Sequence, residues 1–495
     1  MPERATDTLA EQLAAFSTET LRHGAPADVR ASVRQRVLDV LGLQLAALDL
    51  QTSQAAIGYV REQGGVAQAH IAGTDGRYPA AWAAFANGVL AHSLDYDDTH
   101  LPSVLHPSAS VVPAALAVAE LSGADGTRLL DAIAVGIETV VRVGMAGYDR
   151  ERRNSVYFEH GQHATSICGA LGAGVAATLL LGGGDDEVVH SIGVAASMAS
   201  GILEANRTGG TVKRLHCGWA AHAGVAAASL VSRGFTGPPT VLEGRFGFLE
   251  AFLQGAGRPA EITAGLGERW EVPGIFFKPY PANHFTHTGL DAARRLRADG
   301  LQAEDIVAAE LGVAGPTVRT IGEPIEGKRV PRTGYEAQFS GPYMVALGFL
   351  GGHGLGAGLA DFTDEVVAEP DRRALMARIS VVSDPECEAI YPNQFPSVLR
   401  VRTRDGGQLE ERVLVNRGGP DDPLSAEELE LKFAENAGRA LSPDEVAALA
   451  GAVRQLGVGP HDGGVADVAI SWSRPRSHEH TPGDLVTADV GARAR

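Results

Sequence analysis

Histidines gather in one part of this sequence, and histidine is the side chain whose charge changes nearest to neutral pH. Ten of the 16 histidines lie between positions 92 and 287: His92, His100, His106, His160, His163, His190, His216, His222, His284 and His287. A single histidine in an apolar stretch is most often a hydrogen-bonded structural residue. Their concentration beside acids and lysines is harder to explain in this way and indicates an active site.

The first group of chemical side chains lies in residues 91–107, AHSLDYDDTHLPSVLHP. It contains Asp95, Asp97, Asp98, Thr99, His100 and His106. The plain interpretation is a loop whose Asp and Thr side chains satisfy backbone donors. Because the segment lies between apolar stretches, we favour the wall of an active site, in which His106 acts as acid or base and the acids orient it.

A second group, HGQHATS, runs from His160 to Ser166. Two histidines at this spacing can bind a metal ion, and His100 or His106 can complete such a site. The motif lacks the glutamate of HExxH, and no third ligand stands at metal-site spacing, so we expect no metal. A metal-dependent hydrolase built on His163 and these three other histidines remains an alternative.

A third group, GGTVKRLHCGWAAHAG at 209–224, places Lys213, His216 and Ala220 on one face of a predicted helix. An ammonium and an imidazole beside small residues suit a ligand that carries a carboxylate. The plain alternative is a Lys-Arg pair on the surface, but the uncharged residues around it argue against this.

A fourth group, FFKPYPANHFTH at 276–287, places Lys278 between aromatic residues, and two prolines stiffen the chain there. A hinge with no chemistry is a serious alternative for this segment.

The composition excludes several classes of protein. The 42 lysines and arginines against 60 acids give a net charge of −18, which argues against a nucleic acid or an anionic membrane as partner. Three scattered cysteines exclude a disulfide framework, and the N-terminus lacks the pattern of a signal peptide, so we expect a cytoplasmic protein. Two long uncharged stretches, 164–184 and 340–360, consist largely of Ala, Gly and Ser, which predicts buried helices instead of membrane spans.

The spacing of apolar residues predicts a mainly α protein: a large all-helical domain with an inserted, smaller α+β domain. Low-charge segments typical of buried helices run through 28–48, 108–122, 126–145, 162–182 and 186–204. Short β-branched runs predict strands at 306–313, 377–383, 397–403 and 408–415, with a hairpin turn at 405–407. Helices are also predicted at 288–299, 426–437 and 443–456.

These patterns divide the chain into four segments. We expect a helical domain at 1–271, an α+β domain at 272–415, a return to the helical domain at 416–458 and a tail at 459–495. The tail is rich in Gly, Pro, Asp and Arg without a clear period, so we expect it to be flexible.

Together, the four groups resemble the MmgE/PrpD family. The matching pieces are HSLDYDDTH with HP at 106–107, GQHAT, GTVKRLHCG, FKPYP with TH at 286–287, EAQFSGPY at 336–343 and DGG…PDDPLSAEEL at 405–429. They follow one another over roughly residues 5–455, and their combination is specific although each piece alone is modest. The family includes 2-methylcitrate dehydratase, cis-aconitate decarboxylase and iminodisuccinate epimerase.

The resemblance implies that the α+β domain is a lid, that the protein is a homodimer, and that its chemistry needs no metal or organic cofactor. Carried over residue by residue, it implies a catalytic site that comprises Asp95, Thr99, His106, His163, Lys213, Lys278 and Tyr343. The chain departs from the decarboxylase branch at two places. Asn283 stands where we expect a histidine, with His284 after it, and one extra residue lies between Thr99 and His106.

We therefore predict a cofactor-independent lyase that moves a proton next to a carboxylate of a small di- or tricarboxylate. Lys213 and Lys278 hold the developing charge, with Arg214 a weaker candidate, while His106 and His163 serve as base and acid in an order that the sequence leaves open. The residues expected to contact the substrate directly are Thr99, Arg214, Asn283 and His284.

Elimination of water is the leading hypothesis for the reaction, with Asp95 orienting an imidazole. Epimerisation or decarboxylation in the same pocket is the second, because both need the same base and the same cations. A catalytically dead helical dimerisation protein is a further alternative.

Overall fold

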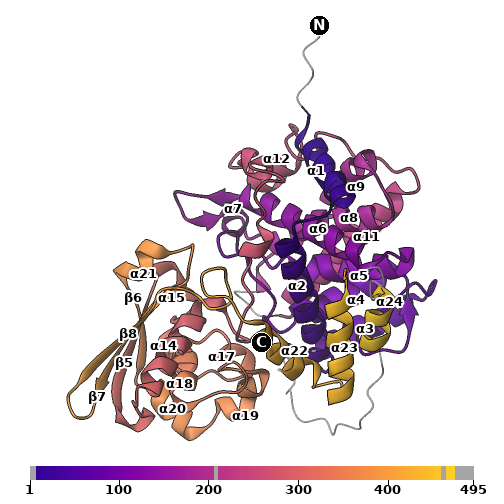
Figure 1. Ribbon diagram of the computed structural model, residues 1–495. Coiled ribbons are helices and arrows are strands. Elements are labelled where there is room, and N and C mark those ends of the chain that lie inside the picture. The colour runs from indigo at the N-terminus through magenta and orange to yellow at the C-terminus, as the bar shows by residue number, and fades with distance from the viewer. Residues whose placement is uncertain (1–6, 206–209, 459–463, 474–495) are drawn as a thin grey trace, which may run out of the picture. The chain divides into compact units, whose positions relative to one another are not determined.

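The computed structural model describes residues 7–205, 210–458 and 464–473 (Figure 1). Helices dominate these residues, which confirms the mainly α class. The residues form two compact units, one with those up to Ile275 and those from Phe433 onward, the other with Phe276–Lys432. Among the described helices, none combines the length and the apolar character that a membrane span needs.

The first unit consists of helices packed around a core of small and branched residues. Its longer helices are α1 (Leu9–His23), α2 (Ala27–Ala46), α3 (Gln51–Gln63), α4 (Ala80–His92), α5 (Ser108–Ser122), α6 (Gly126–Met145), α8 (Ala164–Leu180), α9 (Asp185–Met198), α11 (Leu215–Val231) and α23 (Pro443–Gln455). Shorter helical turns between them are α7 (Val156–Glu159), η1 (Val212–Arg214), α12 (Phe248–Leu253), α13 (Ala260–Thr263) and η2 (Val272–Gly274).

The all-helical expectation for this unit misses two small hairpins. They pair β1 (Ala69–His70) with β2 (Arg77–Tyr78), and β3 (Tyr148–Asp149) with β4 (Asn154–Ser155). Strands this short leave no alternating pattern in the sequence, which is why the sequence analysis did not find them.

Helices α4, α8 and α11 pack closely because glycines lie where their backbones meet. A Cβ atom on Gly224 of α11 would lie 2.5 Å from the backbone nitrogen of Gly174 in α8. A Cβ atom on Gly88 of α4 would lie 2.8 Å from the Cα of Gly218 in α11. Any larger side chain would push these helices apart. This packing brings together the helix ends that carry the candidate site.

The end of the chain contains a helix that the sequence analysis missed. Residues 459–495 were expected to be a flexible tail, but 464–473 are ordered around α24 (Val465–Trp472), so the expectation is wrong there; 459–463 and 474–495 lie outside the described residues. Trp472 is 1% exposed, and its carbonyl oxygen accepts the backbone N–H of Gly73 at 3.2 Å. The apolar stripe of this helix is too short to be distinct among the surrounding glycines and prolines.

The second unit contains a four-stranded sheet in the order β6-β5-β7-β8. Its strands confirm the four β-branched runs: β5 (Ile306–Val313), β6 (Ile379–Ser383), β7 (Ser397–Thr403) and β8 (Gln408–Val413). Strand β5 runs parallel to β6 and antiparallel to β7, and β7 and β8 form the predicted hairpin. Gly406 lies in the hairpin turn with φ of 87°, a conformation that glycine adopts without strain.

Two helices of the second unit pack on this sheet and on each other (Figure 1). They are α14 (His287–Ala298), which contacts β7 and β8, and α18 (Gly341–Leu350), which contacts β5 and β6. The remaining helices are η3 (His284–Thr286), η4 (Ala303–Asp305), α15 (Gly315–Ile321), α16 (Ile325–Arg329), α17 (Gly334–Ala337), η5 (Leu359–Phe362), α19 (Asp364–Val367), α20 (Pro370–Met376), α21 (Pro385–Ile390) and α22 (Ala426–Ala437), of which α22 continues past the end of the unit.

The boundaries of the second unit differ from the expected 272–415. The backbone N–H of Phe277 donates to the carbonyl of Gly418 at 2.9 Å, and Leu424 and Leu429 belong to the apolar core of this unit. Residues up to Lys432 therefore group with the sheet and not with a return to the helical domain. The sequence does not reveal this, because the pattern of an amphipathic helix does not say which core its apolar face meets.

Candidate active site

A buried ion pair holds the loop that follows α4. Arg36 of α2 donates to Asp98 at 2.9 Å, and both side chains are at most 2% exposed. Asp98 also accepts the backbone N–H of Ser108, at the start of α5, at 3.2 Å. Losing one partner would leave an unpaired charge in the core, so this pair fixes the loop firmly. Asp98 thus positions its neighbours in the loop.

His106 takes one tautomer because of this loop. Its Nδ1 atom lies 2.6 Å from the carbonyl oxygen of Asp98, and since a carbonyl only accepts, Nδ1 carries a hydrogen. In the neutral ring, Nε2 then has the lone pair that can take a proton. The Thr99 hydroxyl lies 3.4 Å from the same Nδ1 atom, which places Thr99 against His106. The geometry of His106 suits a base.

His92, the last residue of α4, is held by a carboxylate. Its Nδ1 atom lies 2.7 Å from Oδ2 of Asp97, and both side chains are fully buried. Such a carboxylate fixes the orientation of the ring. The centroid of the His92 ring lies 5.4 Å from that of His106 and 5.7 Å from that of His163. His92 is therefore a neighbour of both residues that the sequence selected as base and acid.

His163 and His216 form a direct imidazole pair. Their Nδ1 atoms lie 2.8 Å apart, and their ring centroids 4.8 Å. His163 is the residue before the first turn of α8, and His216 lies in the first turn of α11. The histidine cluster, as named from here on, consists of His92, His106, His163 and His216.

Burial favours the neutral form of the pair. Burial lowers the pKa of His163 well below the usual 6.5, and electrostatic repulsion from the neighbouring basic groups, Lys213 among them, lowers it further. Burial also lowers the pKa of His216 to about 4, again with a contribution from His92 and Lys213. A neutral imidazole offers both a lone pair and an N–H group, so each ring can accept or donate one proton.

Lys213 supplies a cation beside the histidine cluster. Its Nζ atom, in η1, donates to Oδ1 of Asp95 at 3.1 Å. The carboxylate favours the charged form of the lysine. Asp95 has φ of 52°, in the left-handed region that non-glycine residues seldom adopt and that is frequent at functional sites. Asp95 was expected to orient an imidazole, but it is paired with Lys213 instead. The carboxylate that contacts an imidazole is Asp97, on His92.

Arg214 follows Lys213 but is tied elsewhere in the first unit. Its guanidinium donates to the Thr52 hydroxyl of α3 at 3.1 Å. This bond anchors η1 to α3. Arg214, which we predicted from the sequence as a weaker candidate for contact with the substrate, thus has a structural role here.

Four predicted site residues belong to the second unit: Lys278, Asn283, His284 and Tyr343. Lys278 is buried. The side-chain oxygen of Asn283 accepts the N–H of Phe285 at 3.1 Å and so caps η3. These two residues lie on the segment that leads into α14.

Aromatic rings surround His284 in the second unit. Ring centroids of His287 and Phe395 lie 4.6 and 5.6 Å from that of His284. Tyr343 is fully buried in the core of this unit, and its hydroxyl donates to the carbonyl of Asp361. That bond fixes the Tyr343 ring within this core.

The histidines chosen for a metal-dependent hydrolase do not gather into one site in the first unit. The Nδ1 atom of His160, an exposed residue, bonds to the carbonyl of Phe252 at 3.0 Å, and His100 bonds to the Ser103 hydroxyl at 2.6 Å. Among the described residues, one group has the close spacing that metal ligands need: His92, Asp97 and Cys217. Its histidine and aspartate are hydrogen-bonded to each other, and we assign no ion to it.

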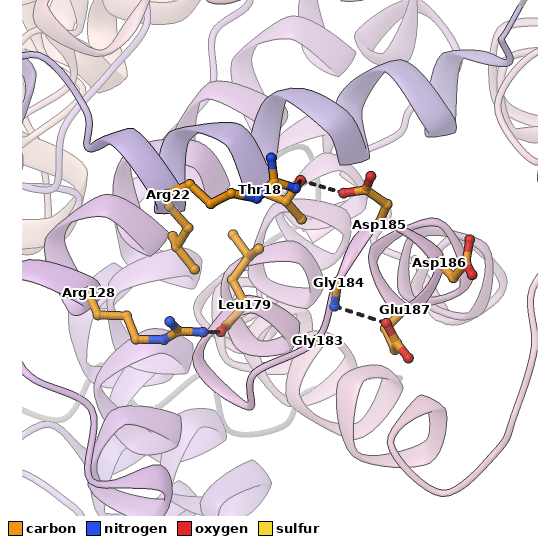
Figure 2. A pocket seen from close by; sticks show the side chains of 10 residues that line it. Thr18, Arg22, Arg128, Leu179, Gly183, Gly184, Asp185, Asp186 and Glu187 are labelled. Atoms are coloured by element: carbon orange, nitrogen blue, oxygen red, sulfur yellow. Dashed lines mark hydrogen bonds between the residues drawn. The ribbon is translucent and has the colours of Figure 1, made fainter.

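A surface cavity of about 570 Å³ also lies in the first unit, near the start of α9 (Figure 2). The Thr18 hydroxyl donates to Asp185 at its edge, and Arg128 donates to the carbonyl of Leu179. Its walls carry both arginines and acids, and none of them belongs to the histidine cluster. The cavity is therefore separate from the candidate site.

Comparison with known proteins decides the family. The MmgE/PrpD N-terminal domain matches residues 11–260, and the MmgE/PrpD C-terminal domain matches residues 280–457. The chain belongs to the MmgE/PrpD family. The histidine cluster and the Lys213–Asp95 pair both lie within the part that matches the N-terminal domain of this family.

Several curated relatives match most of this MmgE/PrpD chain. Cis-aconitate decarboxylase from Homo sapiens is 29% identical over 438 residues, which cover 86% of each chain. Cis-aconitate decarboxylase-like protein oryM from Aspergillus oryzae is 25% identical, over 90% of this chain and 94% of its own. 2-Methylcitrate dehydratase from Cupriavidus necator is 25% identical, over 84% of this chain and 88% of its own. Decarboxylases and dehydratases are lyases, so the protein is an enzyme of the lyase class.

The sequence alone does not reveal the roles of three residues in the site: His92, Asp97 and His216. His92 ends a helix, and Asp97 follows five positions later in a loop. This spacing matches neither helix nor strand periodicity, so it does not predict a contact between the two side chains. His216 was noticed beside Lys213, but its partner His163 lies in another helix. Only the packing of α4, α8 and α11 joins these side chains.

Proposed function

We propose that this protein is a lyase that removes a proton next to a carboxylate of a small di- or tricarboxylate. The observation that carries the proposal is the histidine cluster of buried, hydrogen-bonded imidazoles beside the Lys213–Asp95 pair. Imidazoles are suited to moving protons near neutral pH, and a held ammonium is suited to stabilising a carboxylate on which negative charge builds up.

His106 is the base in this proposal. Because its Nδ1 hydrogen is engaged by the Asp98 carbonyl, its Nε2 lone pair is the one that accepts the substrate proton. The carbon–hydrogen bond breaks, its electron pair moves toward the adjacent carboxylate, and the proton goes to Nε2 of His106.

Lys213 stabilises the charge that develops on that carboxylate. Asp95 keeps the lysine charged and limits where its Nζ atom can lie. A cation that is already in place costs no reorganisation when the charge appears, which is why such groups contribute strongly to rate.

His163 is the acid. The electron pair returns from the carboxylate to form a carbon–carbon double bond, the carbon–oxygen bond breaks, and His163 gives a proton to the leaving hydroxyl group, which departs as water. Since burial opposes a charged His163, we expect the neutral ring to donate through its N–H, as a neutral histidine can in other enzymes.

The residues of the second unit stay predictions for the same reaction. Lys278 is expected to be a second cation for the substrate, and its unit is expected to act as a lid. Tyr343 is the weakest candidate, since its hydroxyl already donates to a backbone carbonyl. Lys278→Ala should lower turnover without loss of folded protein if this lysine contacts the substrate.

Dehydration remains the leading reaction, with decarboxylation as the second candidate. The decarboxylation hypothesis is supported by the higher identity to the Homo sapiens cis-aconitate decarboxylase than to the dehydratase. Dehydration is favoured by Asn283, whose side chain caps η3 where the decarboxylase branch leads us to expect a histidine. Epimerisation uses the same proton abstraction and is the third possibility. The homodimer and the cytoplasmic location also stay predictions.

Proton NMR in deuterated water tests the proposal. The enzyme is mixed in turn with citrate, methylcitrate, cis-aconitate and imino- or aminodicarboxylates. We expect deuterium to enter one of them next to a carboxylate, followed by loss of water or of carbon dioxide. The product separates dehydration from decarboxylation, and exchange with inversion alone indicates epimerisation.

His106→Ala is the critical variant for this experiment. It should abolish deuterium exchange while the folded content, measured by circular dichroism, stays unchanged. Full exchange and turnover in folded His106→Ala and His163→Ala proteins would show that the histidine cluster is structural.

A further inference from the structure

We propose that His216 is a positioning residue that holds His163 in the tautomer needed for an acid. The inference rests on the proposed role of His163 in proton transfer and adds a second histidine behind it. In this arrangement the Nδ1–H of His216 donates to the Nδ1 lone pair of His163, so that the hydrogen of His163 lies on Nε2.

The Nδ1 atoms of His163 and His216 lie 2.8 Å apart. At this distance the atoms share a hydrogen bond, and only one of them carries the hydrogen. A neutral imidazole has one N–H and one lone pair. If one ring donates through Nδ1, its Nε2 atom has the lone pair, and the Nε2 atom of the other ring carries the hydrogen. In either arrangement, therefore, one Nε2 atom of the pair carries a hydrogen and the other has a lone pair.

His106 decides which way the pair is oriented. Its Nδ1 hydrogen bonds to a carbonyl, which makes its Nε2 atom an acceptor and gives it the role of base. A reaction that removes one proton and returns another needs a donor as well. His163 is that donor only in the Nε2–H tautomer, which requires His216 to be the hydrogen donor of the pair.

Hydrogen bonds hold the two backbone segments that carry His163 and His216 in place. The Ser166 hydroxyl, in the first turn of α8, donates to the backbone carbonyl of His216 at 3.0 Å. The backbone N–H of His163 donates to the carbonyl of Gly201 at 3.1 Å. Together with the glycine contacts between α8 and α11, these bonds fix the distance between the rings.

The groups around the pair favour a neutral state. The centroid of the His92 ring of α4 lies 5.7 Å from that of His163, and burial lowers the pKa of both His163 and His216, with His92 and Lys213 lowering it further. These neighbours bring positive charge or none, and the pair itself is buried. Both rings are therefore neutral, and a single hydrogen lies between their Nδ1 atoms. The hydrogen-bond geometry then determines which tautomer each ring takes.

The first test reads the tautomers without using activity. The full-length protein is labelled with ¹⁵N-histidine, and long-range ¹H–¹⁵N correlation spectra distinguish Nδ1–H from Nε2–H rings. We expect His216 in the Nδ1–H form and His163 in the Nε2–H form, with a downfield proton for the bond between them. Two Nε2–H rings, or the reverse pairing, would overturn the inference.

The second test compares two variants of His216. In His216→Asn, the amide N–H₂ can still donate to His163, so we expect elimination within a few-fold of the wild-type rate. In His216→Leu, the donor is lost, and elimination should fall by about 10²-fold, the usual contribution of a general acid, while deuterium exchange by His106 continues. A purely structural role would lower exchange and elimination together.

His222→Leu is the matched control on the same helix. Its ring bonds to the carbonyl of Ala81 and lies outside the histidine cluster, so the ratio of exchange to elimination should not change. Full turnover in His163→Ala would contradict the proposed function itself. If His163→Ala has lowered turnover while folded His216→Leu keeps wild-type turnover, only the proposed role of His216 is contradicted. If His216→Leu does not fold, the tautomers of the wild-type protein decide.

Discussion

The Nζ atom of Lys213 lies 3.1 Å from Oδ1 of Asp95, across a separation of 118 residues in the sequence. The contact joins the turn before α11 to the loop after α4. Lys213 lies three residues before His216 of the histidine cluster, and Asp95 has φ of 52°, in the left-handed region.

Lys213→Ala should lower turnover by about 10²–10³-fold, because the loss of one preorganised charge beside a developing oxyanion typically has this effect. Lys213→Arg should not restore full activity, since a planar guanidinium does not replace a compact ammonium. Steady-state kinetics on the substrate found by NMR measure both. Arg245→Ala removes an exposed cation that stacks on Phe246 and should leave kcat unchanged. Near-normal turnover of Lys213→Ala would mean that this lysine is only structural.

His100 should make the folded protein less stable as the pH falls. Burial, with a smaller contribution from Arg36, lowers the pKa of His100 to about 4, against 6.5 in an unfolded chain. Between these values the unfolded chain takes up a proton that the folded protein does not, so the free energy of unfolding decreases as the pH falls from 6.5 to about 4.

His100→Asn should flatten this dependence, because asparagine can keep the bond to Ser103 and does not titrate. Urea unfolding at pH 8 and at pH 5 measures the effect. At pH 8 the histidine is neutral in both states, so any difference there reports packing alone. An equal stability difference at both pH values would show that His100 does not titrate as expected.

Activity should survive removal of metal ions. The proposed reaction uses imidazoles and lysine, and the close group His92, Asp97 and Cys217 contains a histidine and an aspartate that are bonded to each other. Prolonged treatment with EDTA, followed by metal analysis and a turnover assay, tests this. Loss of turnover that zinc or iron restores, and that Cys217→Ala mimics, would establish a metal mechanism instead.

Trp472→Ala should destabilise the first unit by about 3–5 kcal/mol, the usual loss when a fully buried aromatic residue is truncated. The side chain is 1% exposed, and α24 packs on α5 and α23. Ile470→Ala, on the same helix but 54% exposed, is the control and should change stability by less than about 0.5 kcal/mol. Equal effects of the two variants in chemical unfolding would mean that α24 does not belong to the folded core.

Local patterns in the sequence were enough to predict much of the fold. Runs of β-branched residues marked the four strands of the second unit, and low-charge apolar segments marked α2, α5, α6 and α8 within a few positions. Both signals depend on the residue types within one segment, which are a property of the segment itself. The motif pieces likewise indicated the MmgE/PrpD family, because motifs are read directly from the chain.

The tertiary structure alone decided which side chains meet. The pairing of His163 with His216 depends on two helices approaching through glycines, and the bond between Lys213 and Asp95 joins distant segments. It also decided that α24 is part of the core and that residues 416–432 belong with the sheet. A sequence pattern shows that a face will be buried, but packing between elements determines what it is buried against and which polar groups are thereby brought within bonding distance.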